Sequence, residues 1–286
     1  MIFSFLKRAV FVFLAASVLA AAASSQTSSF SDAASARKKN ANPKLAIPFV
    51  PGEKLLYEGK LDIGILPAVS VAELNFSVGE TPVDTPFQIN AEARSKGTII
   101  KLFGFSFFMQ VDSTITRDDF YALKTVKHDV QKERVRDSET IFDYKTDRVT
   151  FTETNPKEPM KPPRTIASQL EGETHDLISA IYMLRLLPFE VGKTFELSVS
   201  DSGLVYRVPV RVTGREKKKT IFGKVWCYRV EPGVFGEGNL IERPGSMVIW
   251  VTDDSRRLPV RALVKANVGK VDIKLKKITN PPKPKT

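Results

Sequence analysis

The chain has 286 residues, and 43 basic against 32 acidic residues give it a formal net charge of +11. The excess lies at the two ends, because residues 49–269 contain almost equal numbers of basic and acidic side chains. The basic character of the whole chain therefore does not favour nucleic-acid binding, and we expect no nucleic-acid partner. A single cysteine, Cys227, excludes an internal disulfide, so the core alone must stabilise the fold.

The first 23 residues have the pattern of a secretory signal peptide. Lys7 and Arg8 precede an uncharged apolar run over residues 9–23, which ends in small side chains. The run is shorter than the roughly 20 residues that cross a bilayer, and no cysteine follows it to carry a lipid anchor. The pattern predicts export to the periplasm or the cell exterior, with no transmembrane segment after cleavage.

The next residues, and those at the far end of the chain, are polar. Residues 24–48 are rich in Ser, Ala, Asn and Lys, and residues 279–286 are mostly Pro and Lys. Such segments bury too little apolar surface to offset the entropy of ordering, so we expect a disordered leader and a disordered tail. Between them, residues 49–278 are predicted to form a single domain. The basic ends could contact anionic phospholipid or peptidoglycan.

Apolar and polar side chains alternate along most of this domain. From residue 103 to 115 the odd positions are mostly apolar, whereas the even positions are mostly polar. The same period of two recurs at residues 73–78, 87–94, 195–212 and 260–276. Alternation is typical of strands with one face in a core and the other in water, and such strands belong to antiparallel sheets.

One segment, residues 176–187, has helical periodicity instead. Its apolar side chains fall on one helix face, Thr174 or Asp176 can cap its start, and Pro188 cannot continue it. The preceding residues 154–173 are rich in Pro and Lys, which predicts a flap or loop. Together these patterns predict a mainly β fold, in which a curved antiparallel sheet, a half-barrel or a barrel packs around one apolar helix.

Three segments resemble a widespread bacterial family of exported proteins known only as a domain of unknown function. They are Pro51–Tyr57, Asp176–Arg185 with Gly192 after it, and Trp250–Asp254 with Pro259 and Val260. The resemblance covers roughly residues 49–277 and is most specific in the helical segment. It implies a secreted or periplasmic β-rich domain, distantly similar to the half-barrels that carry lipoproteins or lipids between membranes. It implies no reaction and no catalytic residues.

Few groups in the sequence are suited to metal binding or catalysis. The two histidines, His128 and His175, lack the spacing of a zinc site, so we expect no metal and no cofactor. His175, Ser179 and Asp176 could serve a hydrolase if they share one helix face. The alternative is that Asp176 or Thr174 caps the helix while Ser179 packs within it. The absence of a G-x-S-x-G turn favours this alternative.

Seven residues are candidates for contact with an apolar or amphipathic ligand: Phe103, Phe105, Phe107, Met109, Tyr182, Arg185 and Trp250. The first four form an apolar stripe at strand spacing, which could line a cavity or could equally belong to a packed core. Arg185 ends the apolar helix, and a buried guanidinium needs a partner there. That partner is either the anionic head group of a ligand or a carboxylate of the protein itself.

These features favour a non-enzymatic exported protein that binds an apolar or amphipathic component of the cell envelope between sheet and helix. A first alternative is a structural or interaction module that engages an envelope protein or a glycan through an edge strand or the tails. A second alternative is a hydrolase that uses His175 and Ser179.

Overall fold

The computed structural model describes residues 47–64, 67–82, 85–97, 106–170, 172–266 and 269–281. They form one 15-stranded sheet and a short helix, α3 (Leu177–Met183). None of the described helical residues form a helix long and apolar enough to cross a membrane. The strands are β1 (Lys54–Asp62), β2 (Val69–Val78), β3 (Phe87–Ser95), β4 (Phe107–Ile115), β5 (Ala122–Gln131), β6 (Arg134–Asp143), β7 (Arg148–Thr154), β8 (Arg164–Gln169), β9 (Thr174–His175), β10 (Thr194–Asp201), β11 (Leu204–Thr220), β12 (Gly223–Pro232), β13 (Gly245–Thr252), β14 (Pro259–Ala266) and β15 (Gly269–Thr279).

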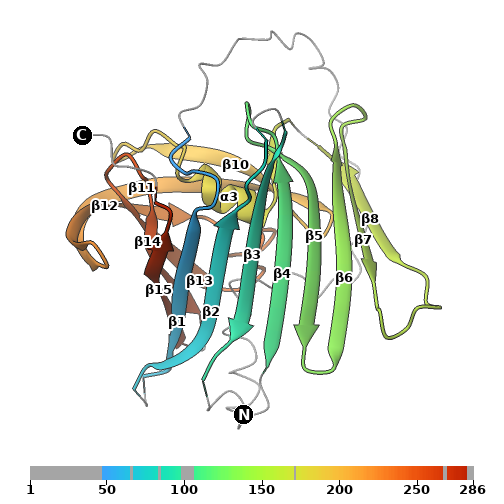
Figure 1. The fold of residues 1–286 in the computed structure, drawn as a ribbon, viewed down its shortest axis with the longest axis horizontal. Helices are drawn as coiled ribbons and strands as arrows, with labels where there is room; N and C mark the ends of the chain where they lie inside the picture. Colours follow the sequence, from blue (N-terminus) through green and yellow to red (C-terminus); the bar gives the residue numbers. More distant parts are fainter. Residues whose placement is uncertain are drawn as a thin grey trace.

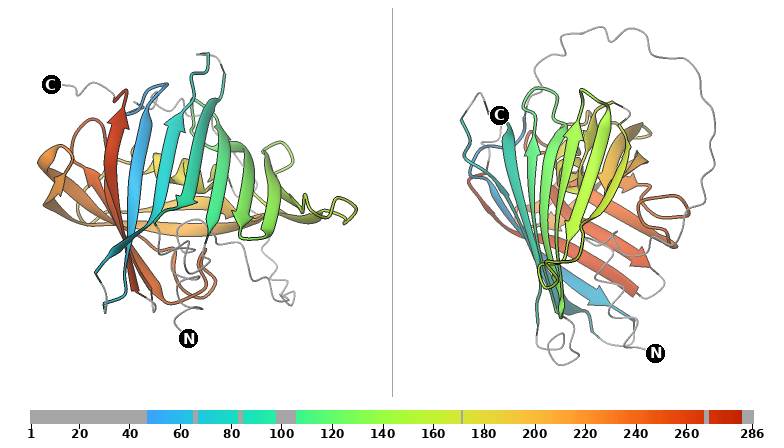
Figure 2. Two further views of the ribbon diagram at one scale, coloured as in Figure 1. Left: turned by 60° about the horizontal axis from the view of Figure 1, so that its bottom comes forward. Right: turned by 90° about the vertical axis from the view of Figure 1, so that its right-hand side faces the viewer.

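The sheet follows the chain almost step by step (Figures 1 and 2). Its order is β8-β7-β6-β5-β4-β3-β2-β1-β15-β14-β13-β12-β11-β10-β9. Neighbouring strands pair antiparallel, apart from the parallel pair β9 and β10. The pairing of β1 with β15 joins the two halves, from Lys54 opposite Thr279 to Asp62 opposite Lys270. The sheet is strongly curved and not closed, which confirms the predicted mainly β fold with a curved antiparallel sheet.

The core lies on the concave side of the sheet, around α3 (Figure 1). Alternate side chains of β1–β4, such as Leu55, Phe76 and Ile89, are buried there, as the alternation in the sequence predicts. From α3, Ile178 and Tyr182 are each only 1% exposed. The helix contacts β3 and β4 on one side and β9 and β10 on the other, so it joins the half of the sheet that contains β1–β8 to the half that contains β9–β15.

α3 begins at a reciprocal capping box. The Asp176 carboxylate accepts the backbone N–H of Ser179 at 2.7 Å, and the Ser179 hydroxyl accepts the backbone N–H of Asp176 at 2.9 Å. Two amides that a helix start leaves without partners are thereby satisfied. The helix ends at Met183, so the predicted range 176–187 is too long. The amides of residues 185–186 bond three residues back, which tightens the chain into turns.

The segment 154–173 contains a strand, which corrects the prediction of a flap or loop there. β8 pairs antiparallel with β7 and forms one edge of the sheet. All four prolines of the segment precede β8, where no ladder amide is needed. β8 is exposed or half-buried along its whole length, so it has no alternation of buried and exposed residues that the sequence could reveal.

The turn between β10 and β11 packs against β7 and β8, near the far edge of the sheet. Gly203 in this turn has φ +83°, and a Cβ there would lie 2.9 Å from the carbonyl oxygen of Ile166 and from the Cβ of Phe151. Glycine is therefore needed here both for the left-handed backbone and for the close approach.

We expect Gly203→Ala to lower the free energy of unfolding by about 2 kcal/mol, because it adds backbone strain and overpacks the contact with β7 and β8. Urea denaturation would measure the change. Gly223→Ala is the matched control, since Gly223 has the same φ of +83° but no atom within 4 Å of its would-be Cβ. It should lose only about 1 kcal/mol. Equal losses for the two variants would show that the close packing of Gly203 against β7 and β8 does not contribute to the loss of stability.

Candidate functional site

The inner face of the sheet changes character from β4 to β5. On β4, Met109 and Val111 are buried against the core. The register places Asp129 and Lys127 of β5 directly opposite them, so these charged side chains share the inner face. Asp129 is only 2% exposed, whereas the apolar Val126 points outward and is 40% exposed. β5 is therefore turned with its polar side inward.

β6 is inverted in the same way, with polar side chains inward and apolar ones outward. Ser138 lies opposite Lys127 and is buried, and Thr140 lies opposite Thr125 on the same inner face. The apolar Ile141 faces outward and is 39% exposed. Polar groups taken out of water are costly unless they are hydrogen-bonded. This part of the concave face therefore requires polar contacts that an ordinary apolar core would not provide.

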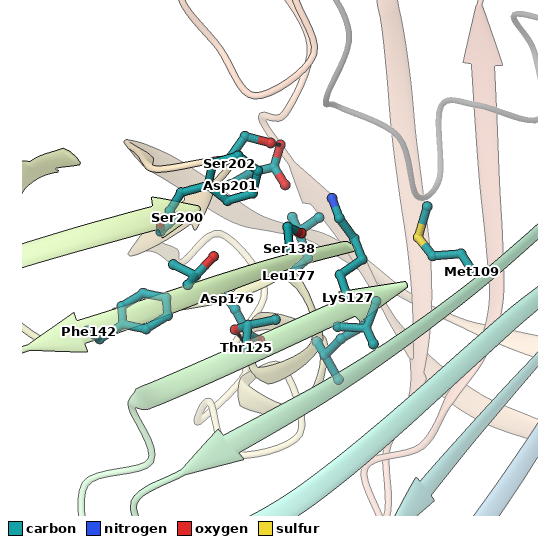
Figure 3. A pocket seen from close by; sticks show the side chains of 14 residues that line it. Met109, Thr125, Lys127, Ser138, Phe142, Asp176, Leu177, Ser200, Asp201 and Ser202 are labelled. Carbon is teal, nitrogen blue, oxygen red and sulfur yellow. Dashed lines mark hydrogen bonds between the residues drawn. The ribbon is translucent and has the colours of Figure 1, made fainter. Parts of the chain in front are cut away.

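A half-open pocket lies between these strands, the start of α3 and the end of β10 (Figure 3). It offers a volume of about 40 Å³ to the centres of water molecules. Apolar side chains such as Met109, Phe142 and Ile178 form part of its wall. Its polar side chains come from four segments of the chain: Thr125, Lys127, Ser138, Thr140, Asp176, Ser200, Asp201 and Ser202. We call this the polar pocket.

The polar groups of this pocket differ in how well they are satisfied. Asp176 accepts the Thr125 hydroxyl at 2.5 Å and the Ser179 hydroxyl at 2.9 Å, so both oxygens of its carboxylate accept hydrogen bonds within the protein. The buried Oγ of Ser200 has no hydrogen-bond partner in the described part of the chain. Lys127 extends its side chain into the pocket and brings a positive charge there (Figure 3). The pocket thus combines a cation with a hydroxyl that still needs a partner.

Ion pairs continue along the inner face beyond the polar pocket. Arg134 lies 3.1 Å from the buried carboxylate of Asp129, and the Gln131 amide donates to the same carboxylate at 2.9 Å. Arg136 of β6 lies 3.8 Å from Glu153 of β7. The polar character therefore extends across β5, β6 and β7.

A second half-open pocket, of about 50 Å³ on the same measure, lies beside the last turn of α3. Its wall is almost entirely apolar and includes Leu55, Leu74, Phe76, Ile181, Leu184, Ile249, Ala262 and Ile273. We call this the apolar pocket. Tyr57 also lines it and donates its hydroxyl to the carbonyl of Pro259 at 2.8 Å. Burial raises the pKa of Tyr57 above its usual value. The hydroxyl of Tyr182 is buried without a hydrogen-bond partner in the described residues.

Arg185 borders the apolar pocket and is paired inside the protein. Its Nη1 and Nη2 lie 2.5 and 3.0 Å from the carboxylate oxygens of Glu53, and neither side chain is more than 1% exposed. Further N–H groups donate to the carbonyls of Pro48 at 2.8 Å and Arg256 at 3.1 Å. The structure thus gives Arg185 the second of the two partners considered from the sequence, a carboxylate of the protein itself.

The other predicted contact residues are dispersed. Phe103 and Phe105 lie outside the described residues. Phe107 is half-buried at the border of the core, Met109 is buried and lines the polar pocket, and Tyr182 lines the apolar pocket. The described end of the predicted stripe thus belongs mainly to the core.

Trp250 lines neither of the two pockets described above. It lies on the opposite face of β13 from Ile249 and is only 5% exposed. Its indole N–H donates to Glu216 at 2.7 Å, and the cationic groups of Lys218 and Arg261 lie 4.4 and 5.1 Å from its ring. Both faces of β13 are buried at this point, so alternation could not tell which face turns inward.

His175 and Ser179 are not joined by a hydrogen bond in the described structure. Ser179 is engaged by Asp176 in the capping box, which is the alternative that the sequence favoured. His175 bonds to the backbone of Phe120, its Nδ1 is buried without a partner among the described residues, and burial lowers its pKa to about 4. The described residues include no group of three or more His, Cys, Asp or Glu placed to hold a metal. Burial also raises the pKa of the Cys227 thiol to about 11, which disfavours the reactive thiolate.

Sequence reasoning missed the polar pocket. Alternation along β5 places Val126 and Val130 on the same face of the strand, and from the sequence alone that apolar face would be expected to turn toward the core. The signal that could have located the pocket is register: the short link from β4 to β5 sets Lys127 opposite the inward-facing Val111. Registers across a turn of unknown geometry cannot be read from the sequence alone.

Comparison with known proteins agrees with this architecture. The fold is similar to that of the β-barrel-like protein of domain of unknown function DUF1849 from Brucella abortus, with a TM-score of 0.54 and 10% identity over 81% of this chain and 98% of that one. At this identity the likeness shows the fold alone. A Bacteroides fragilis protein described as exported and YmcC-like in fold gives a TM-score of 0.31 and 11% identity, over 82% and 98% of the two chains. A protein described as a lipoprotein from Parabacteroides distasonis gives 0.31 and 10%, over 82% and 99%.

No curated protein matches the sequence significantly. The model of the protein family of unknown function DUF3108 matches residues 60–276, which is most of the chain and nearly all of the sheet. This match confirms the resemblance to a bacterial family of exported β-rich domains. The chain belongs to the DUF3108 family.

Proposed function

We propose that this protein is an exported component of the bacterial cell envelope that binds an amphipathic envelope molecule on the concave side of its sheet, without transforming it. The observation that carries the proposal is the inversion of β5 and β6. These strands turn Lys127, Ser138 and Thr140 inward and leave Val126 and Ile141 facing water.

The polar pocket suits the head group of such a molecule. Lys127 supplies a positive charge, and the unpartnered Oγ of Ser200 supplies a donor or acceptor that water or a ligand can satisfy. An anionic or hydroxyl-bearing head group would fit this pair best, because hydrogen bonds to charged groups are stronger than those between neutral groups. Asp176 is already satisfied within the protein and plays no part in the proposed contact.

The apolar pocket suits the other part of the same molecule. It lies one helical turn away along α3, since Ile178 lines the polar pocket and Ile181 and Tyr182 line the apolar one. A water molecule needs roughly 10–15 Å³ on this measure, so each pocket accepts only a few atoms. The ligand would therefore place a head group and the end of a chain in the two pockets and leave the rest outside.

The test is native mass spectrometry of the protein purified from periplasm without detergent, followed by extraction into organic solvent. We expect a bound mass that extracts as an amphipathic molecule. Lys127→Ala should reduce its occupancy about tenfold or more, because a charge-assisted contact is lost. Ala262→Leu should also reduce it, because three added carbons fill part of the apolar pocket.

Lys124→Ala is the matched control. Lys124 lies on the same strand but on the outer face, where its partner is the exposed Glu139. The Lys124→Ala variant should carry as much bound ligand as the wild type. A protein that carries no bound mass from periplasm and takes up none from added envelope lipids would contradict the proposal.

A further inference from the structure

The hairpin of β11 and β12 extends as a two-stranded ribbon beyond the rest of the sheet. β10 pairs with β11 only as far as Arg211, and β13 pairs with β12 only from Cys227 onward. In the strand ladders, residues 214–225 therefore pair only across this hairpin, and their turn projects at the left of Figure 1. Glu216 and Lys218 on one face of the ribbon contact Trp250, and the carbonyl of Trp226 accepts the N–H of Asp253 at 2.9 Å. This projecting stretch contains five basic residues and one acidic residue, whereas residues 49–269 as a whole are nearly neutral.

The basic residues of the ribbon gather on one face. The register sets Lys217 opposite Trp226 and Lys219 opposite Lys224, and in an antiparallel pair such residues share a face. All four side chains are exposed, and Trp226 is 43% exposed. The Lys217 ammonium lies 5.1 Å from the Trp226 ring. None of the three lysines has a carboxylate partner in the described part of the chain, unlike Arg215, which pairs with Asp253 at 2.6 Å.

An apolar side chain completes this surface at the tip. Ile221 lies in the turn and is 42% exposed, whereas Phe222 beside it packs against the core and against Arg256, whose guanidinium lies 4.1 Å from the Phe222 ring. Exposure of a tryptophan and an isoleucine to water costs free energy, and a soluble polyanion such as polyphosphate offers no apolar surface to cover them. In the interfacial region of a bilayer, however, indole rings are favoured, and lysines there are attracted to anionic lipids. The combination of charge and apolar tip therefore favours a membrane surface over a nucleic acid or other soluble polyanion.

We propose that this face of the β11–β12 hairpin docks on an anionic phospholipid surface. Trp226 and Ile221 enter the interfacial layer, and Lys217, Lys219 and Lys224 lie over the phosphate groups. The proposal involves no residue of either pocket, so it stands or falls independently of ligand binding on the concave face.

Co-sedimentation with vesicles of phosphatidylglycerol and phosphatidylcholine tests the charge. The full exported protein should bind these vesicles and should bind much more weakly to vesicles of phosphatidylcholine alone. It should dissociate from the anionic vesicles as the salt concentration rises. Each lysine near an anionic surface contributes about a fivefold factor in affinity, so the triple variant Lys217→Gln, Lys219→Gln, Lys224→Gln should bind on the order of 100-fold more weakly.

The matched control removes three exposed lysines elsewhere, by Lys145→Gln, Lys161→Gln and Lys265→Gln. It has the same net charge as the hairpin variant and should retain most of the binding. An equal loss in both triple variants would overturn the proposal, since the attraction would then reflect net charge alone. Absence of binding by the wild type would overturn it directly. Circular dichroism and the melting temperature check that both variants are folded.

Tryptophan fluorescence tests insertion. The emission of exposed Trp226 should shift to shorter wavelength with anionic vesicles, and Trp226→Phe should abolish the shift, because Trp250 is already buried. Inorganic polyphosphate should cause no such shift. Binding to vesicles without a shift, displaced equally well by polyphosphate, would assign the hairpin to soluble polyanions and overturn docking on lipid.

Discussion

Replacement of Glu53 by alanine is expected to lower the free energy of unfolding by about 3–5 kcal/mol. The change would leave the guanidinium of Arg185 charged in a site where it is only 1% exposed. Its other neighbours are the rings of Phe49 and Tyr182, at 5.1 and 5.5 Å, and two backbone carbonyls, none of which can neutralise it. Urea denaturation, with the midpoint and the slope both fitted, would measure the loss.

Arg94→Ala is the control for this prediction. Arg94 also pairs with a glutamate, Glu73, but its side chain is 55% exposed. Pairs of this kind contribute less than about 1 kcal/mol, so the variant should be nearly as stable as the wild type. Equal losses for Glu53→Ala and Arg94→Ala would mean that water reaches Arg185 and that the pair is not a buried one.

The double variant Glu53→Leu, Arg185→Met separates the ion pair from the other bonds of Arg185. Apolar replacements of both partners remove the unpaired charge, so part of the loss should be recovered. Recovery should be incomplete, because the carbonyls of Pro48 and Arg256 would lose their donors, and a buried acceptor without a partner costs about 1–3 kcal/mol.

This ion pair and the hydrogen bonds around it bring together the three distant segments that resemble the family. Glu53 and Tyr57 come from the first segment, and Arg185 ends the helical one. Backbone carbonyls of the third region, at Arg256 and Pro259, accept bonds from Arg185 and Tyr57. The resembling residues thus converge on one buried polar cluster beside the apolar pocket. These bonds fix the end of α3 to β1 and to the link between β13 and β14.

The sequence was most informative where one physical effect dominates. Strands with a core on one face alternate, so β2, β3, β4, β14 and β15 could be located from period two alone. The helix start could be placed because Asp176 offers a cap, but its end could not, because residues 184–187 remain apolar after the helical bonding stops. β8 escaped prediction because an exposed edge strand needs no alternation.

The candidate site was less predictable, because it depends on which face of a strand turns inward. Alternation shows that two faces differ and assumes that the apolar one is buried. β5 breaks this assumption with Val126 outside and Lys127 inside, and β13 escapes it because both faces are buried. Strands that violate the pattern are expected where a protein needs polar groups inside, which is why the inversion carries more functional information than the apolar stripe of β4.

Acidification is expected to remove about 3 kcal/mol of stability through His175 alone. Burial lowers the pKa of His175 to about 4 in the folded protein, against 6.5 for an ordinary histidine. The unfolded chain therefore binds a proton first as pH falls. The contribution of neutral His175 is fully present above pH 6.5 and is lost progressively as pH falls toward 4. Each unit of pKa difference corresponds to about 1.4 kcal/mol, which gives the expected size.

The measurement compares urea unfolding at pH 7 and pH 4 for the wild type and His175→Gln. Carboxylates such as Asp254, whose pKa is lowered by hydrogen bonds from Arg256 and Thr252 in spite of burial, also lose stability in acid, but they are common to both proteins. His175→Gln should lower stability at pH 7 and then lose about 3 kcal/mol less than the wild type on acidification. Equal losses on acidification in the two proteins would contradict the lowered pKa of His175 in the folded state.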